Sequence, residues 1–204
     1  MEKIQNYING KLIGPKSGKY INNYSPVNGE IYSLIPDSDH DDIDMAVDAA
    51  REAFIYWSKL TKAQRYDHIM HLADLVEKYF DELVKAESKD NGKPEWLASL
   101  VDIPRASENF RFFATASLHF DSEIHEMDGK AINYTLRQPI GVAGCISPWN
   151  LPIYLLTWKI APALAAGNTV VAKPSEITPM TAYIFSKICK EANFPNGVIN
   201  IVHG

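Results

Sequence analysis

The sequence of residues 141–176 is GVAGCISPWNLPIYLLTWKIAPALAAGNTVVAKPSE, and this stretch decides the fold. An apolar run typical of a buried strand ends at a sharp turn, Ser147-Pro148-Trp149-Asn150. A helical pattern follows the turn, and a second apolar strand ends at Lys173. Polar groups therefore stand where strands end and helices begin, which is where open α/β sheets bind their ligands.

From residue 141 onward the pattern alternates between strand and helix. The strands are apolar throughout, which is typical of parallel strands covered on both faces. Right-handed crossovers then give half of a doubly wound sheet. We predict an α/β fold: a partial, Rossmann-like parallel sheet of three strands, preceded by helices and an antiparallel arm. The strands are expected at residues 142–147, 169–173 and 198–202, and the helices at about 152–166 and 179–193. We expect one face and one edge of this sheet to be uncovered, and the chain to be poorly soluble by itself.

Turn and cap signals organise the residues before this sheet. Asn9-Gly10 suits a two-residue hairpin turn, and Thr61 is a typical first residue of a helix. The acidic run at 37–44 suits a solvated helix start; it lacks the glycine and glutamate spacing of a calcium loop, and we expect no metal site. The expected elements are a hairpin over 7–13, a strand at 30–35, and helices from 37–39 onward, over 61–91 and over 95–118, the last kinked at Pro104.

Residues 130–138 alternate between apolar and polar side chains. Ile132, Tyr134 and Leu136 fall on one side of an extended strand, with polar side chains between them. This alternation predicts a half-exposed antiparallel strand. Such an arm extends a sheet or contacts another subunit.

Composition limits the function classes. A hydrophobic share of 46% in 204 residues provides a core, and the net charge of −5 with dispersed Lys and Arg argues against nucleic acid as a partner. The longest apolar stretch, 151–166, is interrupted by Pro152, Lys159 and Pro162, so we expect no membrane span. The two cysteines lie in apolar surroundings, and no signal peptide is apparent, so we expect a reducing, cytoplasmic setting.

Asn150, Lys173 and Glu176 are the polar candidates at the strand ends. The Asn150 amide can donate a hydrogen bond to an oxygen that gains charge during a reaction, or it can simply cap the next helix, and spacing alone favours the cap. Glu176 can accept hydrogen bonds from ribose hydroxyls and would repel a 2′-phosphate, which favours NAD over NADP. An exposed Lys173–Glu176 ion pair is equally compatible with the spacing.

Several long motifs together resemble the aldehyde dehydrogenase superfamily, and the resemblance covers the whole chain. They are Pro148-Trp149-Asn150, APALAAGNT at 161–169, and KPSE at 173–176 followed by Thr178-Pro179, in matching order and spacing. Within the superfamily the chain most resembles the 2-aminomuconic and 2-hydroxymuconic semialdehyde dehydrogenases. This closer match is carried by Asp102-Ile103-Pro104-Arg105, by NFRFFA at 109–114, and by residues 147–152 and 154–159.

The resemblance implies an NAD-dependent oxidation of an aldehyde to a carboxylic acid, in tryptophan (kynurenine) or catechol breakdown. Asn150 matches the family's oxyanion amide, Ser147 and Trp149 match positions lining the cofactor cleft, and Lys173 and Glu176 match ribose contacts. It also suggests that Arg105 anchors the substrate carboxylate, for which a guanidinium is well suited. An ion pair on the helix surface is an equally good interpretation of Arg105 from the sequence.

The family's nucleophilic cysteine, its general-base glutamate and its glycine-rich turn all correspond to positions after residue 204. Cys145, inside a strand, and Cys189, on an amphipathic helix, do not replace the nucleophile. We therefore expect residues 1–204 to be the N-terminal part of the NAD-binding domain, with an arm at about 130–138 and without the catalytic domain, and to be inactive alone. A free-standing dinucleotide-binding or assembly module, or one half of a split enzyme, is the alternative. Relatives of full length are expected to form homo-oligomers through this arm.

Overall fold

The computed structural model describes residues 1–204, and its centre is a five-stranded sheet with the order β3-β2-β10-β9-β8. Strands β8, β9 and β10 run parallel, as the sequence predicts, and β2 is antiparallel to β10. The three predicted parallel strands are thus confirmed, and the N-terminal hairpin β2–β3 adds two antiparallel strands because it pairs with β10, which is distant in sequence. The strands of this sheet are β2 (Asn6–Ile8), β3 (Lys11–Ile13), β8 (Val142–Ile146), β9 (Thr169–Lys173) and β10 (Ile199–Ile201).

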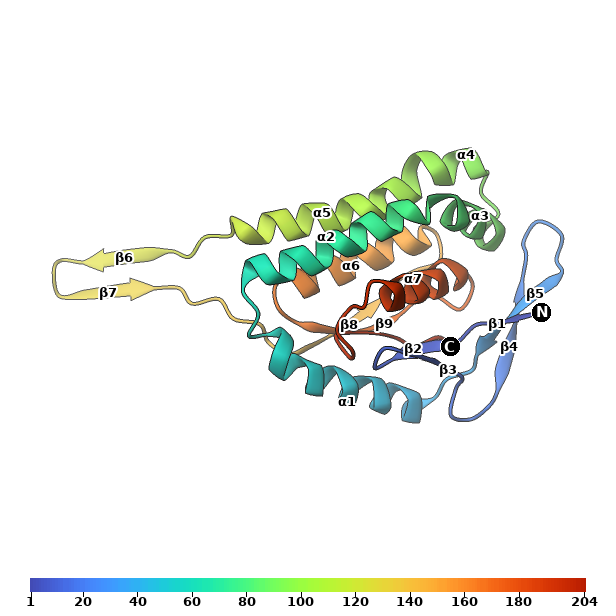
Figure 1. Ribbon diagram of the computed structural model, residues 1–204, viewed down its shortest axis with the longest axis horizontal. Coiled ribbons are helices and arrows are strands. Elements are labelled where there is room, and N and C mark those ends of the chain that lie inside the picture. The colour runs from blue at the N-terminus through green and yellow to red at the C-terminus, as the bar shows by residue number, and fades with distance from the viewer.

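Helices cover both faces of this sheet (Figure 1). Helix α1 (His40–Trp57) packs on one face, and α6 (Pro152–Ala165) and α7 (Met180–Glu191) pack on the other. Helices α2 (Lys62–Lys78) and α5 (Ile103–Leu118) form an outer layer over α6 and α7. The expectation of an uncovered face was wrong, because α1 supplies the missing layer.

The central strands are buried and the edge strand is not. All of β10 and nearly all of β9 are buried, whereas Gly144 and Ile146 of β8 are exposed because β8 forms an edge of the sheet. Phe110 of α5 stacks on Phe185 of α7 with ring centroids 5.6 Å apart, and both side chains are fully buried. Burying such side chains contributes roughly 1.5–3 kcal/mol each, which fixes the outer layer on the inner one.

Local capping explains where α1 and α2 begin. The Asp39 side chain accepts from the amide of Asp41 and forms a capping box with Asp42, so the acidic run is a helix start, as predicted. Thr61 forms the same arrangement with Gln64. Thr178 does not cap α7 in this way; its hydroxyl donates instead to the carbonyl of Trp149, at 3.3 Å.

The two helices expected at 61–91 and 95–118 are each interrupted. The first divides at Tyr79 into α2 and α3 (Phe80–Asn91). The second consists of α4 (Glu95–Leu97), a π-helical segment (Ala98–Asp102) and α5. The predicted kink at Pro104 is this π segment: proline has no N–H to donate to the carbonyl four residues earlier, and its ring displaces that carbonyl.

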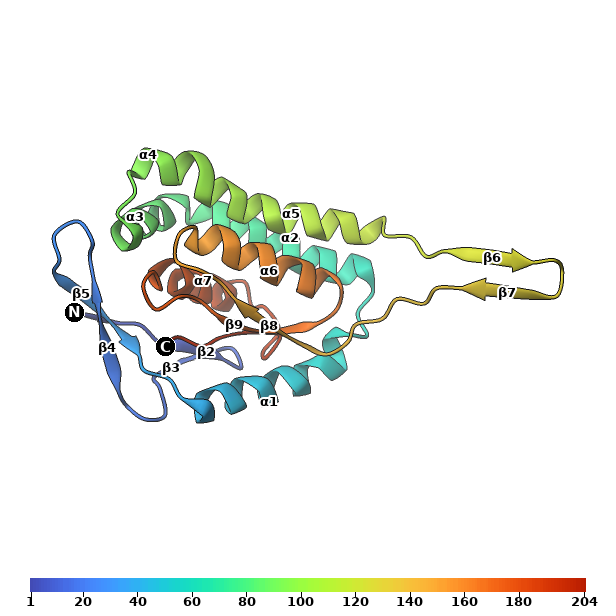
Figure 2. The same cartoon turned by 180° about the vertical axis from the view of Figure 1, so that it is seen from behind.

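The arm is a two-stranded hairpin, β6 (Ile124–Met127) and β7 (Ala131–Tyr134), that projects from one end of the molecule (Figure 2). Every residue of both strands is exposed, so the predicted half-exposed strand was wrong: in this chain nothing packs on either side of it. A small second sheet of β1 (Glu2–Lys3), β5 (Ile31–Pro36) and β4 (Tyr20–Tyr24) lies at the opposite end. No helix combines the length and the apolar character needed to cross a membrane.

Candidate functional site at the carboxyl ends of the parallel strands

The carboxyl ends of β8, β9 and β10 meet at one edge of the sheet. Ile146 lies beside Lys173, and Ala172 lies beside Ile201. The amide of Ser147 donates to the carbonyl of Lys173 at 3.1 Å, which continues the pairing one residue past β8. The residues that follow these strands are therefore close together, as expected for a ligand site in an open α/β sheet.

Buried polar atoms without a partner mark this edge. The Ser147 hydroxyl and both ring nitrogens of His203 have no hydrogen-bond partner within the protein. Burial, together with the charge of the nearby Lys173, lowers the pKa of His203 to about 3, so the imidazole is neutral at ordinary pH. Buried polar groups almost always have hydrogen-bond partners. These three atoms do not, so their hydrogen-bonding capacity is unused within the protein. His203 was missed from the sequence, because nothing in its local pattern distinguishes it from a residue after a buried strand.

Lys173 and Glu176 form an ion pair at the end of β9. Their Nζ and Oε2 atoms are 2.7 Å apart, and both side chains are partly exposed. The hydrogen bond from Lys173 lowers the pKa of Glu176, which keeps the carboxylate charged. The structure thus contains the ion pair considered from the sequence, and it places the carboxylate where it can still accept further hydrogen bonds.

The turn between β8 and α6 carries Trp149 and Asn150, and both are exposed. Helix α6 has Leu151 as its N-cap residue, with no side-chain capping bond. Asn150 therefore does not cap the helix, which was the interpretation that spacing favoured. Its side-chain amide makes no hydrogen bond within the protein, so both amide hydrogens remain available.

Arg105 lies near the start of α5. Its guanidinium pairs with Glu108 at 3.2 Å and lies over the ring of Tyr154 at 5.8 Å. It lines a cavity of about 410 Å³ that Asn109, Phe112 and Trp158 also line. Helix α6, which begins directly after the Asn150 turn, supplies the Tyr154 ring and Trp158. The ion pair expected as one alternative is present, and the same guanidinium faces a cavity.

Both cysteines are unsuited to nucleophilic attack. Cys145 in β8 and Cys189 in α7 are buried free thiols, and burial raises the pKa of each. A raised pKa leaves little thiolate, the reactive form. Both thiols are thus buried with a raised pKa, as expected; that neither acts as the nucleophile stays a prediction.

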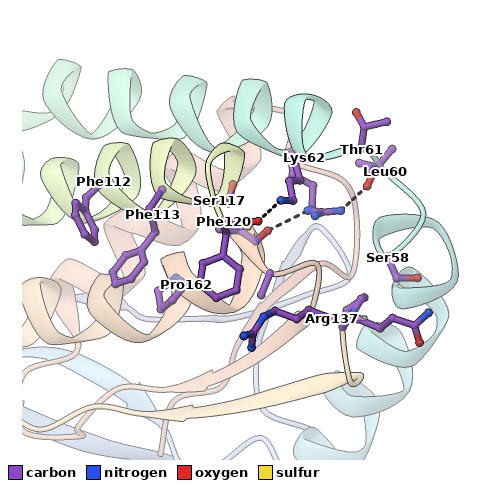
Figure 3. A pocket seen from close by; sticks show the side chains of 16 residues that line it. Ser58, Leu60, Thr61, Lys62, Phe112, Phe113, Ser117, Phe120, Arg137 and Pro162 are labelled. Atoms are coloured by element: carbon purple, nitrogen blue, oxygen red, sulfur yellow. Dashed lines mark hydrogen bonds between the residues drawn. The ribbon is translucent and has the colours of Figure 1, made fainter. Parts of the chain in front are cut away.

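A second cavity, of about 630 Å³, lies at the base of the arm and is separate from the strand ends (Figure 3). It is lined by aromatic side chains from the end of α5 and by residues of the segment that leads from the arm into β8. The Lys62 ammonium is bonded to the Phe120 carbonyl at 2.8 Å, and Arg137 lies over the Phe120 ring. Because Pro139 lies just before β8, this cavity is at the amino end of the sheet and does not belong to the candidate site.

The fold and the site together define an α/β protein with a Rossmann-like arrangement, in which polar groups gather at the carboxyl ends of parallel strands. The sequence profile of the aldehyde dehydrogenase family matches residues 13–204. The chain belongs to the aldehyde dehydrogenase family.

Similar proteins carry more specific names. The chain is 52% identical over 202 residues to 2-aminomuconic semialdehyde dehydrogenase from Homo sapiens, covering 98% of this chain and 41% of that protein. It is 44% identical to 2-hydroxymuconic semialdehyde dehydrogenase from Pseudomonas sp. (strain CF600), covering 100% of this chain and 43% of that protein. The NAD+ complex of an aldehyde dehydrogenase from Bacillus cereus superimposes with a TM-score of 0.96 at 40% identity, covering 100% and 42% of the two chains. The chain thus spans less than half the length of the relatives it matches.

Proposed function

We propose that this chain is the N-terminal part of the NAD-binding domain of an NAD-dependent aldehyde dehydrogenase that oxidises a muconic semialdehyde. The observation that carries the proposal is the set of unpartnered polar atoms at the carboxyl ends of parallel strands, on Ser147 and His203. The identity to two muconic semialdehyde dehydrogenases, 52% and 44%, supports the substrate class. Tryptophan or catechol breakdown would then be the setting.

The residues at this edge fit a dinucleotide. We assign the Glu176 carboxylate to ribose hydroxyls, the Lys173 ammonium to the same region, and the Ser147 hydroxyl and the exposed Trp149 ring to the walls of the cofactor cleft. Bound NAD supplies the acceptor for the hydride that leaves the substrate. A carboxylate at the ribose disfavours a 2′-phosphate, so NAD is preferred over NADP.

Asn150 is proposed as the donor to the oxygen that becomes negatively charged when the aldehyde is attacked. Its amide has no partner within the protein, and it follows β8 directly. One such donor contributes about a hundredfold to a thousandfold in rate. Arg105 is proposed to hold the carboxylate of the semialdehyde, since its guanidinium faces a cavity beside α6, which begins at the Asn150 turn.

The arm suggests how the protein assembles, and the two free thiols suggest the compartment in which it resides. The exposed apolar side chains of β6 and β7, Ile124, Ile132 and Tyr134, suit contact with another subunit of a homo-oligomer. Two free cysteines suit a reducing compartment, and we propose the cytoplasm.

Two assays on the purified chain test the proposal together. Titration with NAD, followed through tryptophan fluorescence, is expected to show saturable binding, because Trp149 is 54% exposed beside the proposed cleft. Incubation with NAD and a semialdehyde is expected to yield no NADH, because neither cysteine present is an accessible thiolate. Absence of NAD binding, or steady NADH production by the chain alone, would each contradict the proposal.

A further inference from the structure

Two residues that follow or end α3 hold the turn that presents Asn150. The Asn91 amide donates to the carbonyl of Trp149 at 3.0 Å and to that of Asn150 at 3.3 Å. The Lys93 ammonium lies 3.4 Å from the same Asn150 carbonyl. Together with the Thr178 hydroxyl, these groups engage both carbonyls of the turn from two other parts of the chain.

Lys93 is itself rigidly held. Its side chain is 8% exposed and lies between Glu87, at 3.1 Å, and Asp102, at 3.0 Å, both of which are essentially inaccessible to solvent. Glu87 belongs to α3 and Asp102 ends the π-helical segment, so the ammonium is fixed to two separate elements. Removing the cation would leave buried carboxyl groups without a partner, which is strongly unfavourable, so the ammonium is kept between them.

Backbone geometry directs Asn91 and Lys93 toward the turn. Gly92 between them has φ +79°, a left-handed conformation that ends α3. The left-handed conformation favours glycine, and a Cβ atom at this position would lie 3.1 Å from the Pro26 side chain, a tight contact. The helix end is thereby closed, and the flanking side chains reach the Trp149–Asn150 backbone.

We infer that Asn91 and Lys93 are positioning residues that fix the Trp149–Asn150 backbone through its carbonyls and so aim the Asn150 side-chain amide. The amide itself has no partner within the protein and caps no helix, so the backbone anchors are what orient it. Only the role of the amide as an oxyanion donor rests on the proposed function; the anchoring does not. A displacement of about 1 Å at such a site reduces rate about a hundredfold.

The test measures backbone order in the 204-residue chain by 15N relaxation. In the wild-type chain, the amides of Trp149 and Asn150 are expected to have order parameters of about 0.85, as in rigid backbone. Asn91→Leu keeps the size of the side chain and removes both donors, and it is expected to lower these values below about 0.6 while that of Ala172 in β9 stays unchanged. Asn28→Leu is the matched control, since Asn28 bonds only within an exposed turn and is expected to alter neither amide of the Trp149–Asn150 turn.

Lys93→Met provides a second, independent variant. It leaves Glu87 and Asp102 buried without their cation, so a lower melting temperature is expected along with the same loss of order at Trp149 and Asn150. Unchanged order parameters in Asn91→Leu would overturn the inference. NAD titration of the same samples tests the proposed function separately. Loss of backbone order in Asn91→Leu without NAD binding by the wild-type chain would support the anchoring and reject the proposed function. NAD binding with unchanged backbone order would support the proposed function and reject the anchoring.

Discussion

The polar side chains at the carboxyl ends of the parallel strands differ in whether they already have a hydrogen-bond or ion-pair partner within the protein. Ser147, Asn150 and His203 offer polar atoms that nothing in the chain engages, whereas Glu176 is held by Lys173. The first group can respond to a ligand without breaking an internal bond. Glu176 must share its carboxylate, and it is the residue that we propose distinguishes the two dinucleotides.

Glu176→Gln is expected to weaken NAD binding about tenfold and to improve NADP binding relative to NAD. A hydrogen bond to a charged acceptor contributes roughly 1.5–3 kcal/mol, and the neutral amide no longer repels a 2′-phosphate. Calorimetric titration with both dinucleotides measures the change. Glu108→Gln, which alters the similarly exposed ion pair with Arg105, is the control and should leave both affinities as they are. Equal NAD affinity in Glu176→Gln and the wild-type chain would exclude Glu176 from the ribose site.

Glu87 makes stability depend on pH. Burial raises its pKa from 4.5 to about 7, with Asp102 raising it and Lys93 opposing the shift. Between these two pH values the folded chain keeps a proton that the unfolded chain has lost, so the free energy of unfolding falls as pH rises, by at most about 1.4 kcal/mol per pH unit. The contribution is fully present below pH 4.5 and is lost by about pH 7.

Glu87→Gln cannot titrate, so its stability relative to the wild-type chain is expected to rise as pH increases across this window. Urea unfolding of both proteins at pH 5 and pH 7.5 measures the difference. Other titrating groups, such as His203, change the free energy of unfolding with pH equally in both proteins, so their contributions cancel in the difference. A difference that is the same at both pH values would show that Glu87 is already ionised in the folded chain.

At the level of elements, helix α1 covers one face of the sheet, and it packs closely against Gly197. Gly197 has φ +79°, and a Cβ atom there would lie 2.5 Å from the carbonyl oxygen of Ala49 in α1. Gly29 has φ +74° but no atom within 4 Å of the same position. Alanine substitutions at these two glycines therefore share the cost of the left-handed conformation, and only the one at Gly197 adds a cost from steric overlap.

Gly197→Ala is therefore expected to destabilise the chain by about 1–3 kcal/mol more than Gly29→Ala, since the added methyl group overpacks α1 against the segment before β10. Both substitutions share the left-handed penalty of roughly 1–2 kcal/mol. Denaturant unfolding of the two variants gives the difference. Equal losses of stability would mean that α1 does not lie against the segment before β10.

Local signals predicted the elements, and distant contacts explain what they missed. The caps at Asp39 and Thr61 use residues within the next turn of helix, so their sequence is sufficient. The pairing of Tyr7 with Ile201 joins opposite ends of the chain, and no local pattern specifies it. The break between α2 and α3 at Tyr79 likewise has no proline or glycine nearby from which it could be predicted. Tertiary packing overrides local pattern at these places.

The same distinction applies to the candidate site. Asn150, Lys173 and Glu176 stand out in the sequence because they follow apolar strands. His203 and the anchors of the Asn150 turn do not, since their importance comes from burial and from groups that lie nearby only in the fold. Asn91 reaches across 58 residues to the Trp149 carbonyl, a contact that the sequence alone does not reveal.

On the scale of the whole molecule, the arm is the part most obviously lacking a partner. Ile132 and Tyr134 project from one face of β7, and Asn133 projects from the other. We expect the chain to self-associate through the apolar face. Sedimentation velocity should show that Ile132→Lys shifts the chain toward monomer, whereas Asn133→Lys, one residue away on the opposite face, leaves association unchanged. Equal effects of both variants would exclude this face as the contact.

The most direct test of the central claim is where NAD binds on the whole chain. Amide chemical shifts of the 204-residue protein, recorded during NAD titration, locate the site without requiring catalysis. Shifts are predicted at Ser147, Lys173, Glu176 and His203, the residues at the carboxyl ends of the parallel strands. Shifts confined to the cavity at the base of the arm, or no shifts at all, would contradict the account.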